Sequence, residues 1–198
     1  MIRTAGWVTM TFLSIAVAGY AISLVALPET RNPFVAELFA NKAFAAHAHM
    51  LGGAIALVTG AFQFNKTLRA RYLAWHRRAG QVYVVAVLTG GVGSLMLAVE
   101  GSGGLVAKWG FGMMGVAWMY STVMAWVKIR GKDVASHQVW MTRSFALTLS
   151  AVTLRFYLPG ALSSGMSFSE VYPVIAWMAW VPNLLVVEWF LLRGARAS

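Results

Sequence analysis

Six apolar stretches, each about twenty residues long, are the feature of this sequence that most limits its fold. An α-helix rises about 1.5 Å per residue, so each stretch is long enough to cross the hydrocarbon core of a bilayer. Only short loops join the stretches, which together use almost all of the 198 residues. We therefore expect an all-α integral membrane protein, a six-transmembrane-helix bundle forming a single membrane domain over residues 1–198. The predicted spans are about 7–27, 43–64, 79–99, 105–127, 135–158 and 171–192.

The composition supports this class of protein. Hydrophobic residues make up 59% of the chain and charged residues 11%, which is far from the balance of a soluble domain. The first apolar stretch is long and no clear small-residue cleavage site follows it, so we read it as a retained helix and not as a signal peptide. The chain has no cysteine, which excludes disulfides and thiolate chemistry.

The placement of the basic residues predicts the orientation. Three Lys or Arg fall on one side of the predicted bundle, namely Arg31, Lys42 and Lys108. Eleven fall on the other, namely Arg3, Lys66, Arg69, Arg71, Arg77, Arg78, Lys128, Arg130, Lys132, Arg193 and Arg196. Because the more basic side of a membrane protein faces the cytoplasm, both termini are expected in the cytoplasm. The expected location of the protein is the bacterial inner (cytoplasmic) membrane. The net charge of +10 thus reflects the orientation of the protein in the membrane, and the basic side chains are expected to contact lipid headgroups. We expect no nucleic acid as a partner.

The acidic residues agree with this orientation. Four of the six acids, Glu29, Glu37, Glu100 and Glu170, fall on the less basic side, which is the outer side in this topology.

A polar stripe follows the fifth predicted span. Read as one helix, residues 137–155 place one set of side chains on a single face at 100° per residue. The stripe has an imidazole at one end, a guanidinium at the other and hydroxyls between, at His137, Trp140, Met141, Ser144, Thr148, Ala151 and Arg155. Arg143 lies off the stripe, and Glu188 in the sixth span is a candidate partner for it. Because an unpaired cation in a bilayer is costly, both Arg143 and Arg155 are expected to face protein or a cofactor.

Two further spans each carry a histidine followed one turn later by a glycine. The pairs are His49 with Gly53 and His76 with Gly80, and Tyr83 continues the second stripe. A glycine in this position leaves a slot beside the imidazole that suits the face of a macrocycle, although ordinary helix packing also explains it. His47 points about 200° away from His49 and so cannot serve the same site.

His76 and His137 are the predicted ligands of a haem b. The topology puts both near the inner surface, each in the first turn of its helix, where a neutral imidazole is favoured. Two neutral imidazoles at one depth are what bis-histidine ligation of a haem in a helical bundle requires. The nearby Arg77 would meet a propionate at the headgroup boundary.

Aromatic side chains on the same stripes, Trp140 and Tyr83, would line this flat cofactor. His49 and Arg155 are expected at similar depth near the outer side, where they would form a second polar site with Met113 or Met114 as partner.

Three functions remain open on these residues. The leading prediction is a haem b electron-transfer protein or oxidoreductase, acting with quinone or another redox partner. The second is a haem-free transporter or sensor that uses the same His and Arg seam, or binds a divalent metal ion through His49, His76 and His137. The third is a structural membrane subunit in which the histidines only pack. A zinc hydrolase is less well supported, because three ligands and a base do not converge at one depth.

Four segments together resemble a known family. In order they read HMLGGAIALVTGAFQF, HRRAGQVY, HQVWMTRSFALTLSAVTLR and YPVIAWMAWVPNLLVVE. They are similar to a bacterial family of multi-pass membrane proteins catalogued as domain of unknown function 2306, over about His49 to Glu188.

The matching positions are His49, Gly60, Gln63, Phe64, His76, Arg77, Gly80, Tyr83, His137, Trp140, Met141, Arg143, Arg155, Asn183 and Glu188. The resemblance implies a membrane bundle and supplies no activity. The histidines on bundle helices also loosely resemble four-helix membrane b-type cytochromes, which is an analogy of architecture alone.

Overall fold

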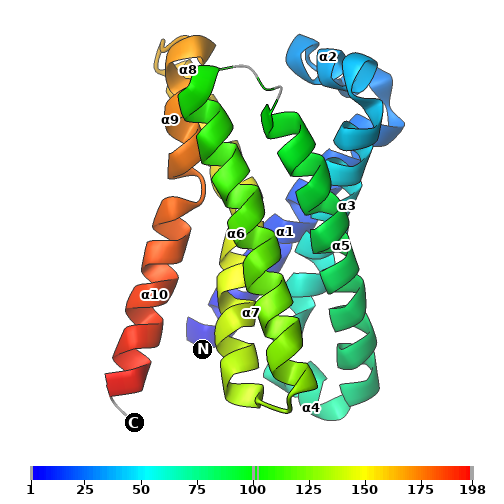
Figure 1. Ribbon diagram of the computed structural model, residues 1–198, viewed down its shortest axis with the longest axis vertical. Coiled ribbons are helices and arrows are strands. Elements are labelled where there is room, and N and C mark those ends of the chain that lie inside the picture. The colour runs from blue at the N-terminus through cyan, green and yellow to red at the C-terminus, as the bar shows by residue number, and fades with distance from the viewer. Residues whose placement is uncertain (1, 100, 102, 197–198) are drawn as a thin grey trace. The chain divides into compact units, whose positions relative to one another are not determined.

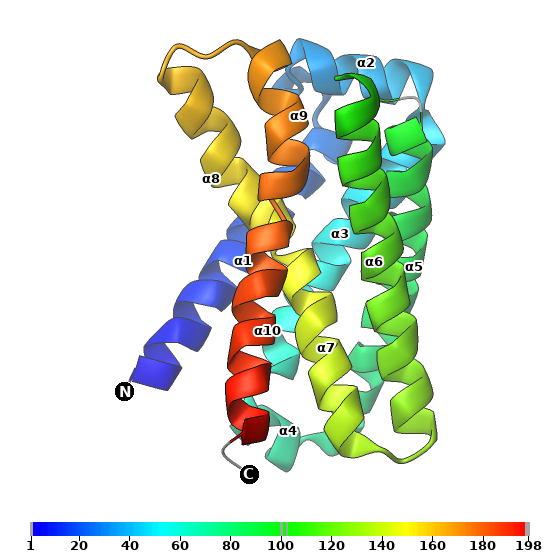
Figure 2. The same cartoon turned by 60° about the vertical axis from the view of Figure 1, so that its left-hand side comes forward.

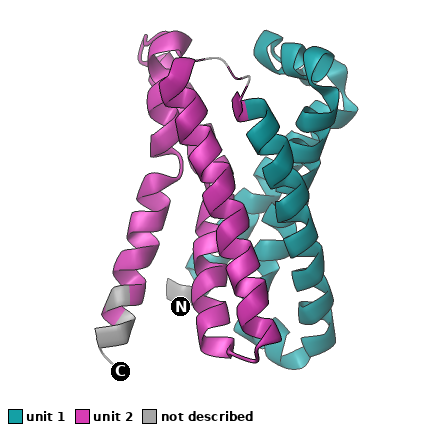
Figure 3. Cartoon of the chain, viewed as in Figure 1, with its two compact units in different colours: residues 1–97 teal, residues 98–198 magenta. Residues whose placement is uncertain are grey.

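The computed structural model describes residues 2–99, 101 and 103–196. Every regular element among these residues is a helix, as the sequence predicts, and the described chain contains no strand. The chain divides into two compact units, residues 1–97 and residues 98–198, which Figure 3 shows in different colours. Glu100, which was expected at the outer surface, lies outside the described residues.

The first unit contains three long helices and three short ones (Figure 1). The long helices are α1 (Ile2–Ala26), α3 (Ala43–Gln63) and α5 (Leu73–Val99), of which α5 ends just beyond the boundary of the unit. The short ones are the 3-10 helix η1 (Pro28–Thr30), α2 (Pro33–Asn41) and α4 (Lys66–Arg71). The α5 helix begins six residues before the predicted span, and this places His76 in its first turn, as expected.

A narrow face of α1 packs along α3. Its buried side chains are mostly small and recur every three or four residues, at Thr11, Ser14, Val17, Ala18, Ala21 and Leu24. At the other end of the pair, the Trp7 indole N–H donates to the carbonyl of Ala61 (3.0 Å). Helices associate in this way in apolar surroundings because small side chains allow close backbone approach.

Arg31 closes the C-terminal end of α1. Its guanidinium donates to the carbonyls of Leu24 (2.6 Å) and Val25 (3.0 Å), which have no partner further along the helix. The same group lies 3.9 Å from the centre of the Phe39 ring. Phe39 and Leu24 belong to a small apolar core that packs the short helix α2 against α3.

The α3 and α5 helices touch backbone to backbone at two glycines. A Cβ built on Gly52 would lie 2.7 Å from the Cα of Gly90 and 2.6 Å from the carbonyl oxygen of Ala86. A Cβ built on Gly93 would lie 2.7 Å from the carbonyl oxygen of Ala45. Neither position has room for a side chain, so these glycines set the distance between the two helices.

The second unit contains α6 (Gly104–Arg130), α7 (Val134–Thr148), α8 (Ser150–Ser163), α9 (Phe168–Met178) and α10 (Val181–Arg196). The α6 helix packs against α7 and α9, while α7 also contacts α10 and α8 also contacts α9 (Figure 2). Val171 and Ile175 of α9, with Ala179 directly after it, form a core with apolar side chains of α8.

The predicted fifth and sixth spans are each interrupted, which corrects the reading of residues 137–155 as one continuous helix. The first break falls at Leu149, between α7 and α8. The second is a short turn at residues 179–180, between α9 and α10, and it is visible in both Figure 1 and Figure 2. Pro182 is the second residue of α10, and because it has no backbone N–H to donate to a carbonyl of the preceding turn, it does not continue α9.

Five of the long segments have the length and composition to cross a membrane. They are residues 4–26, 43–63, 73–99, 134–163 and 168–191, and each of the last two includes a break. The α6 helix, which covers the predicted fourth span, has 27 residues but does not reach the hydropathy of the others. Its many Trp, Tyr, Gly, Ser and Thr residues, together with Lys108, lower its average.

A first prediction concerns the glycine contact. We expect Gly52→Ala to destabilise the protein by about 1–3 kcal/mol. The added methyl would clash with backbone atoms of α5, which can be relieved only by shifting the helix. Gly53→Ala is the matched control, since no described residue lies within 4 Å of a Cβ at Gly53. Thermal unfolding of both variants in one detergent measures the difference. Equal stability of the two would contradict this role of Gly52.

Candidate functional site

The polar face of α7 lies against α6, as the stripe predicts. The Trp118 indole N–H donates to the hydroxyl of Thr148 (2.8 Å), and the hydroxyls of Thr122 and Ser144 lie 2.6 Å apart. All four side chains are buried. The expected inward-facing seam is therefore confirmed for this part of the stripe, and α6 is its partner.

His137 continues this seam toward the start of α7. Asp133 caps the helix by accepting from the backbone N–H of Ser136 (3.0 Å), and hydrogen bonds from Ser136 hold the pKa of the Asp133 carboxyl below its ordinary value. One turn on, the Nδ1 atom of His137 lies 2.9 Å from the carbonyl oxygen of Ala125. A carbonyl only accepts, so Nδ1 carries the proton and the neutral ring keeps its lone pair on Nε2.

His49 makes a similar contact in the first unit. Its Nδ1 atom lies 3.3 Å from the carbonyl oxygen of Gly90 on α5. Gly53, one turn further along α3, has open space where a Cβ would be, judged from the described residues. His47, two positions earlier, bonds to Ala43 of its own helix and is exposed. The prediction that His47 and His49 serve different faces is confirmed.

His76 is held by the amide of Gln63, a buried residue at the end of α3. The orientation that satisfies both ends of this amide has its nitrogen donating to Nδ1 and to the carbonyl of His76, while its oxygen accepts from the N–H of Gly80 (3.3 Å). In that orientation Nδ1 is the acceptor and Nε2 carries the proton. A metal at Nε2 would require the amide to turn over and accept from Nδ1.

The other predicted residues of α5 differ in their surroundings. Tyr83 is fully buried and Arg77 is exposed. A Cβ on Gly80 would meet no described atom within 4 Å, so the slot expected beside His76 is open there. Arg77 is thus placed to reach a charged group at the surface, whereas Tyr83 is part of the packed interior.

The predicted partnership of Arg143 and Glu188 is confirmed. The guanidinium binds the carboxylate with two hydrogen bonds, from Nε to Oε1 (2.5 Å) and from Nη2 to Oε2 (2.9 Å). The same guanidinium lies 4.5 Å from the ring centre of Trp140, which makes an edge contact with Tyr120 on α6. The charge is therefore satisfied by α10 and by an aromatic face.

A polar contact at the breaks in the second unit was not foreseen. Asn183, at the start of α10, donates to the carbonyl of Ala146 (3.2 Å) and shares a hydrogen bond with the hydroxyl of Thr153 (3.0 Å). Ala146 and Thr153 lie on opposite sides of the break at Leu149, so Asn183 joins the ends of α7 and α8. A polar Asn183 next to Pro182 in an apolar span could have indicated a break in the helix. The spacing of residues could not have identified the groups that Asn183 contacts.

Arg155 extends the stripe beyond the break. Its Nη1 atom donates to the carbonyl of Ala151 one turn earlier in α8 (2.8 Å), and the side chain is half-buried. Its predicted role beside a cofactor or with His49 stays a prediction.

The structure separates two of the candidate histidines. His49 and the Gln63 that contacts His76 are fourteen residues apart on α3, or about 21 Å. They therefore belong to opposite ends of the α3–α5 pair, as predicted. His76 and His137 belong to different units, and their pairing stays a prediction from sequence. No group of three or more His, Asp or Glu that could hold a metal ion occurs among the described residues.

These observations define a multi-pass α-helical membrane protein with polar contacts between its helices. Residues 46–191, which are most of the chain, match the family described as "Predicted membrane protein (DUF2306)". The chain belongs to this family, and the resemblance noted in the sequence is confirmed. The comparison with curated proteins and that with solved structures give no match.

A second prediction concerns the ion pair of α7 and α10. Glu188→Gln should destabilise the protein by about 2 kcal/mol, because Arg143 would keep its charge and lose a charge-assisted partner. Adding Arg143→Gln to that variant should cost less than Arg143→Gln does alone, since the contact is already broken. A double-mutant cycle from unfolding in micelles measures this coupling. Strict additivity of the two changes would show that the pair contributes nothing.

Proposed function

We propose that this protein is a membrane haem b protein that transfers electrons, with quinone as its redox partner. The observation that supports this best is the setting of His137. Its Nδ1–H donates to a backbone carbonyl of a neighbouring helix, which fixes the ring and leaves the Nε2 lone pair for a metal. Ligating histidines in metal and haem sites are held in this way.

The other residues of the proposed haem site fit in part. The sequence assigns His76 as the second ligand because the predicted topology puts it at the same membrane surface as His137. If His76 bound a metal through Nε2, its Nδ1–H would have to donate to the amide oxygen of Gln63. The Gln63 amide would therefore have to rotate when the metal binds. Arg77 is exposed and available for a propionate, whereas Arg143 is already bound to Glu188. A bound haem would supply one-electron transfer through its iron.

The proposed location is the bacterial inner membrane, with six spans and both termini in the cytoplasm. In this proposal the α6 helix is the fourth span along the chain and completes the set of six. Its 27 residues extend about 40 Å, which exceeds the hydrocarbon core. Crossing by α6 also keeps Lys128, Arg130 and Lys132 on the same side as the basic segment around α4.

A second candidate function, haem-free transport or sensing, is favoured by the helix breaks. Interrupted membrane helices whose free backbone groups meet polar side chains are typical of transporter substrate sites. The contact of Asn183 with Ala146 and Thr153 has this character. A site of that kind would use the same α7–α8 segment as the haem proposal.

A third prediction tests the haem. Protein purified after expression with ample haem should show a Soret band and paired α and β bands on reduction. His137→Ala and His76→Ala should each remove most of this spectrum, whereas His47→Ala should retain it, because His47 lies on another face. A colourless wild-type protein would overturn the proposal. So would an unchanged spectrum in both His76→Ala and His137→Ala, and metal without haem would favour the second candidate.

A fourth prediction tests the topology. After Ser198, a fused reporter that works only in the cytoplasm should be active, and one that works only in the periplasm should be inactive. Reporters inserted at Gly101 and at Gly131, which flank α6, should report opposite sides if this helix crosses the membrane. If both reporters indicate the same side, α6 does not cross the membrane. The N- and C-termini would then lie on opposite sides.

A further inference from the structure

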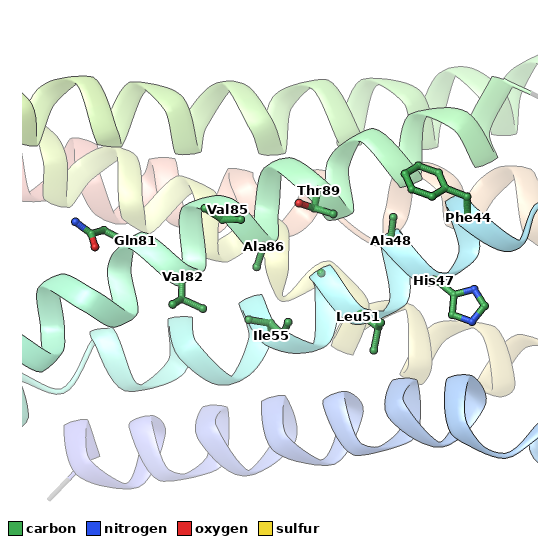
Figure 4. A pocket seen from close by; sticks show the side chains of 11 residues that line it. Phe44, His47, Ala48, Leu51, Ile55, Gln81, Val82, Val85, Ala86 and Thr89 are labelled. Atoms are coloured by element: carbon green, nitrogen blue, oxygen red, sulfur yellow. The ribbon is translucent and has the colours of Figure 1, made fainter.

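An apolar groove of about 520 Å³ runs between α3 and α5 within the first unit (Figure 4). Its lining is Phe44, His47, Ala48, Leu51, Gly52 and Ile55 from α3, with Gln81, Val82, Val85, Ala86 and Thr89 from α5. Gly52, where the two helices are in close contact, is one of these lining residues. The volume is in the range of small-molecule sites.

The dimensions of the groove suit one hydrocarbon tail. Its α3 wall from Phe44 to Ile55 is about 17 Å long, roughly half of the hydrocarbon core of a bilayer. Both helices are membrane-spanning segments, so the groove lies at membrane depth. No Lys or Arg is among the lining residues, which leaves a phosphate headgroup without a charged partner there.

His47 marks one end of the groove and determines what head the ligand must have. Its Nδ1 atom lies 2.6 Å from the carbonyl oxygen of Ala43, so Nδ1 carries the proton and Nε2 of the neutral ring can only accept. The ring of Phe39 meets the imidazole edge-on at 4.9 Å and supports it. The molecule bound at this end must therefore bring a hydrogen-bond donor.

We propose that the groove binds a prenyl quinol, with its phenolic O–H donating to Nε2 of His47 and its tail along α3 and α5. Phe44 lies one turn from His47 at the same end, as Figure 4 shows, and offers an aromatic face to the quinol ring. The choice of a quinol among lipid-soluble hydroxylic molecules rests on the proposed function. The groove itself and the acceptor at its end do not depend on a haem.

Binding of decylubiquinol to the full chain in lipid nanodiscs, measured against empty nanodiscs, tests the groove. Val85→Trp should fill it and raise the dissociation constant at least tenfold. Val92→Trp is the matched control, because Val92 lies on the same helix, is also exposed and does not line the groove. Equal binding by the two variants would overturn the groove as the site.

The head is tested separately. His47→Phe should weaken binding of decylubiquinol roughly tenfold, the effect of losing one good hydrogen bond. The dimethyl ether of the same quinol, which has no O–H, should bind wild type and His47→Phe equally. If His47→Phe binds decylubiquinol as tightly as wild type, the head assignment is wrong.

These outcomes are distinct from those of the haem test. A colourless protein that binds decylubiquinol in the groove would overturn the proposed function and support the quinol site. A protein with the haem spectrum but with equal binding by Val85→Trp and Val92→Trp would do the reverse. Displacement of the quinol by phosphatidylglycerol at equal concentration would overturn the quinol as occupant, since it would show a phospholipid site.

Discussion

Polar groups inside a membrane bundle must find their partners within the protein, and the local structure of both units follows from this requirement. In the second unit the break at Leu149 is tolerated because Asn183 takes the carbonyl of Ala146 and the hydroxyl of Thr153. In the first unit Arg31 takes the carbonyls at the end of α1. The long-range polar contacts are therefore part of what fixes the helices, because leaving such groups unpaired in apolar surroundings is costly.

The same requirement sets the chemistry that the histidines can do. His137 and His49 each place Nδ1 against a backbone carbonyl of a neighbouring helix, and His76 receives the amide of Gln63 instead. A carbonyl fixes the tautomer because it can only accept, whereas an amide can present either end. The carbonyl of Ala125 therefore favours the Nδ1–H tautomer of His137, whereas His76 can adopt either tautomer if Gln63 turns.

The sequence was sufficient where a short pattern determines the outcome. Hydropathy located the long helices, and the stripe from His137 to Thr148 predicted an inward face, which packs on α6. The cost of an unpaired cation in a bilayer made Glu188 a candidate partner of Arg143, and the two residues are paired. The sequence was insufficient where the outcome depends on contacts with residues far away in the chain. Gly52 and Gly53 are adjacent and identical, yet only Gly52 meets the backbone of α5. The break at Leu149 has no proline or glycine beside it, and its stabilising partner is more than thirty residues away at Asn183.

The groove changes which histidine is nearest to a lipid-soluble redox partner. His47 and His49 lie within one turn at the same end of α3, one facing the groove and the other facing α5. The Gln63 that holds His76 is about 24 Å further along the same helix from His47. A quinol bound at His47 would therefore be adjacent to the second polar site predicted at His49, and far from His76. If electrons pass between a quinol in this groove and a cofactor, His49 is the residue through which the two sites are closest within the first unit.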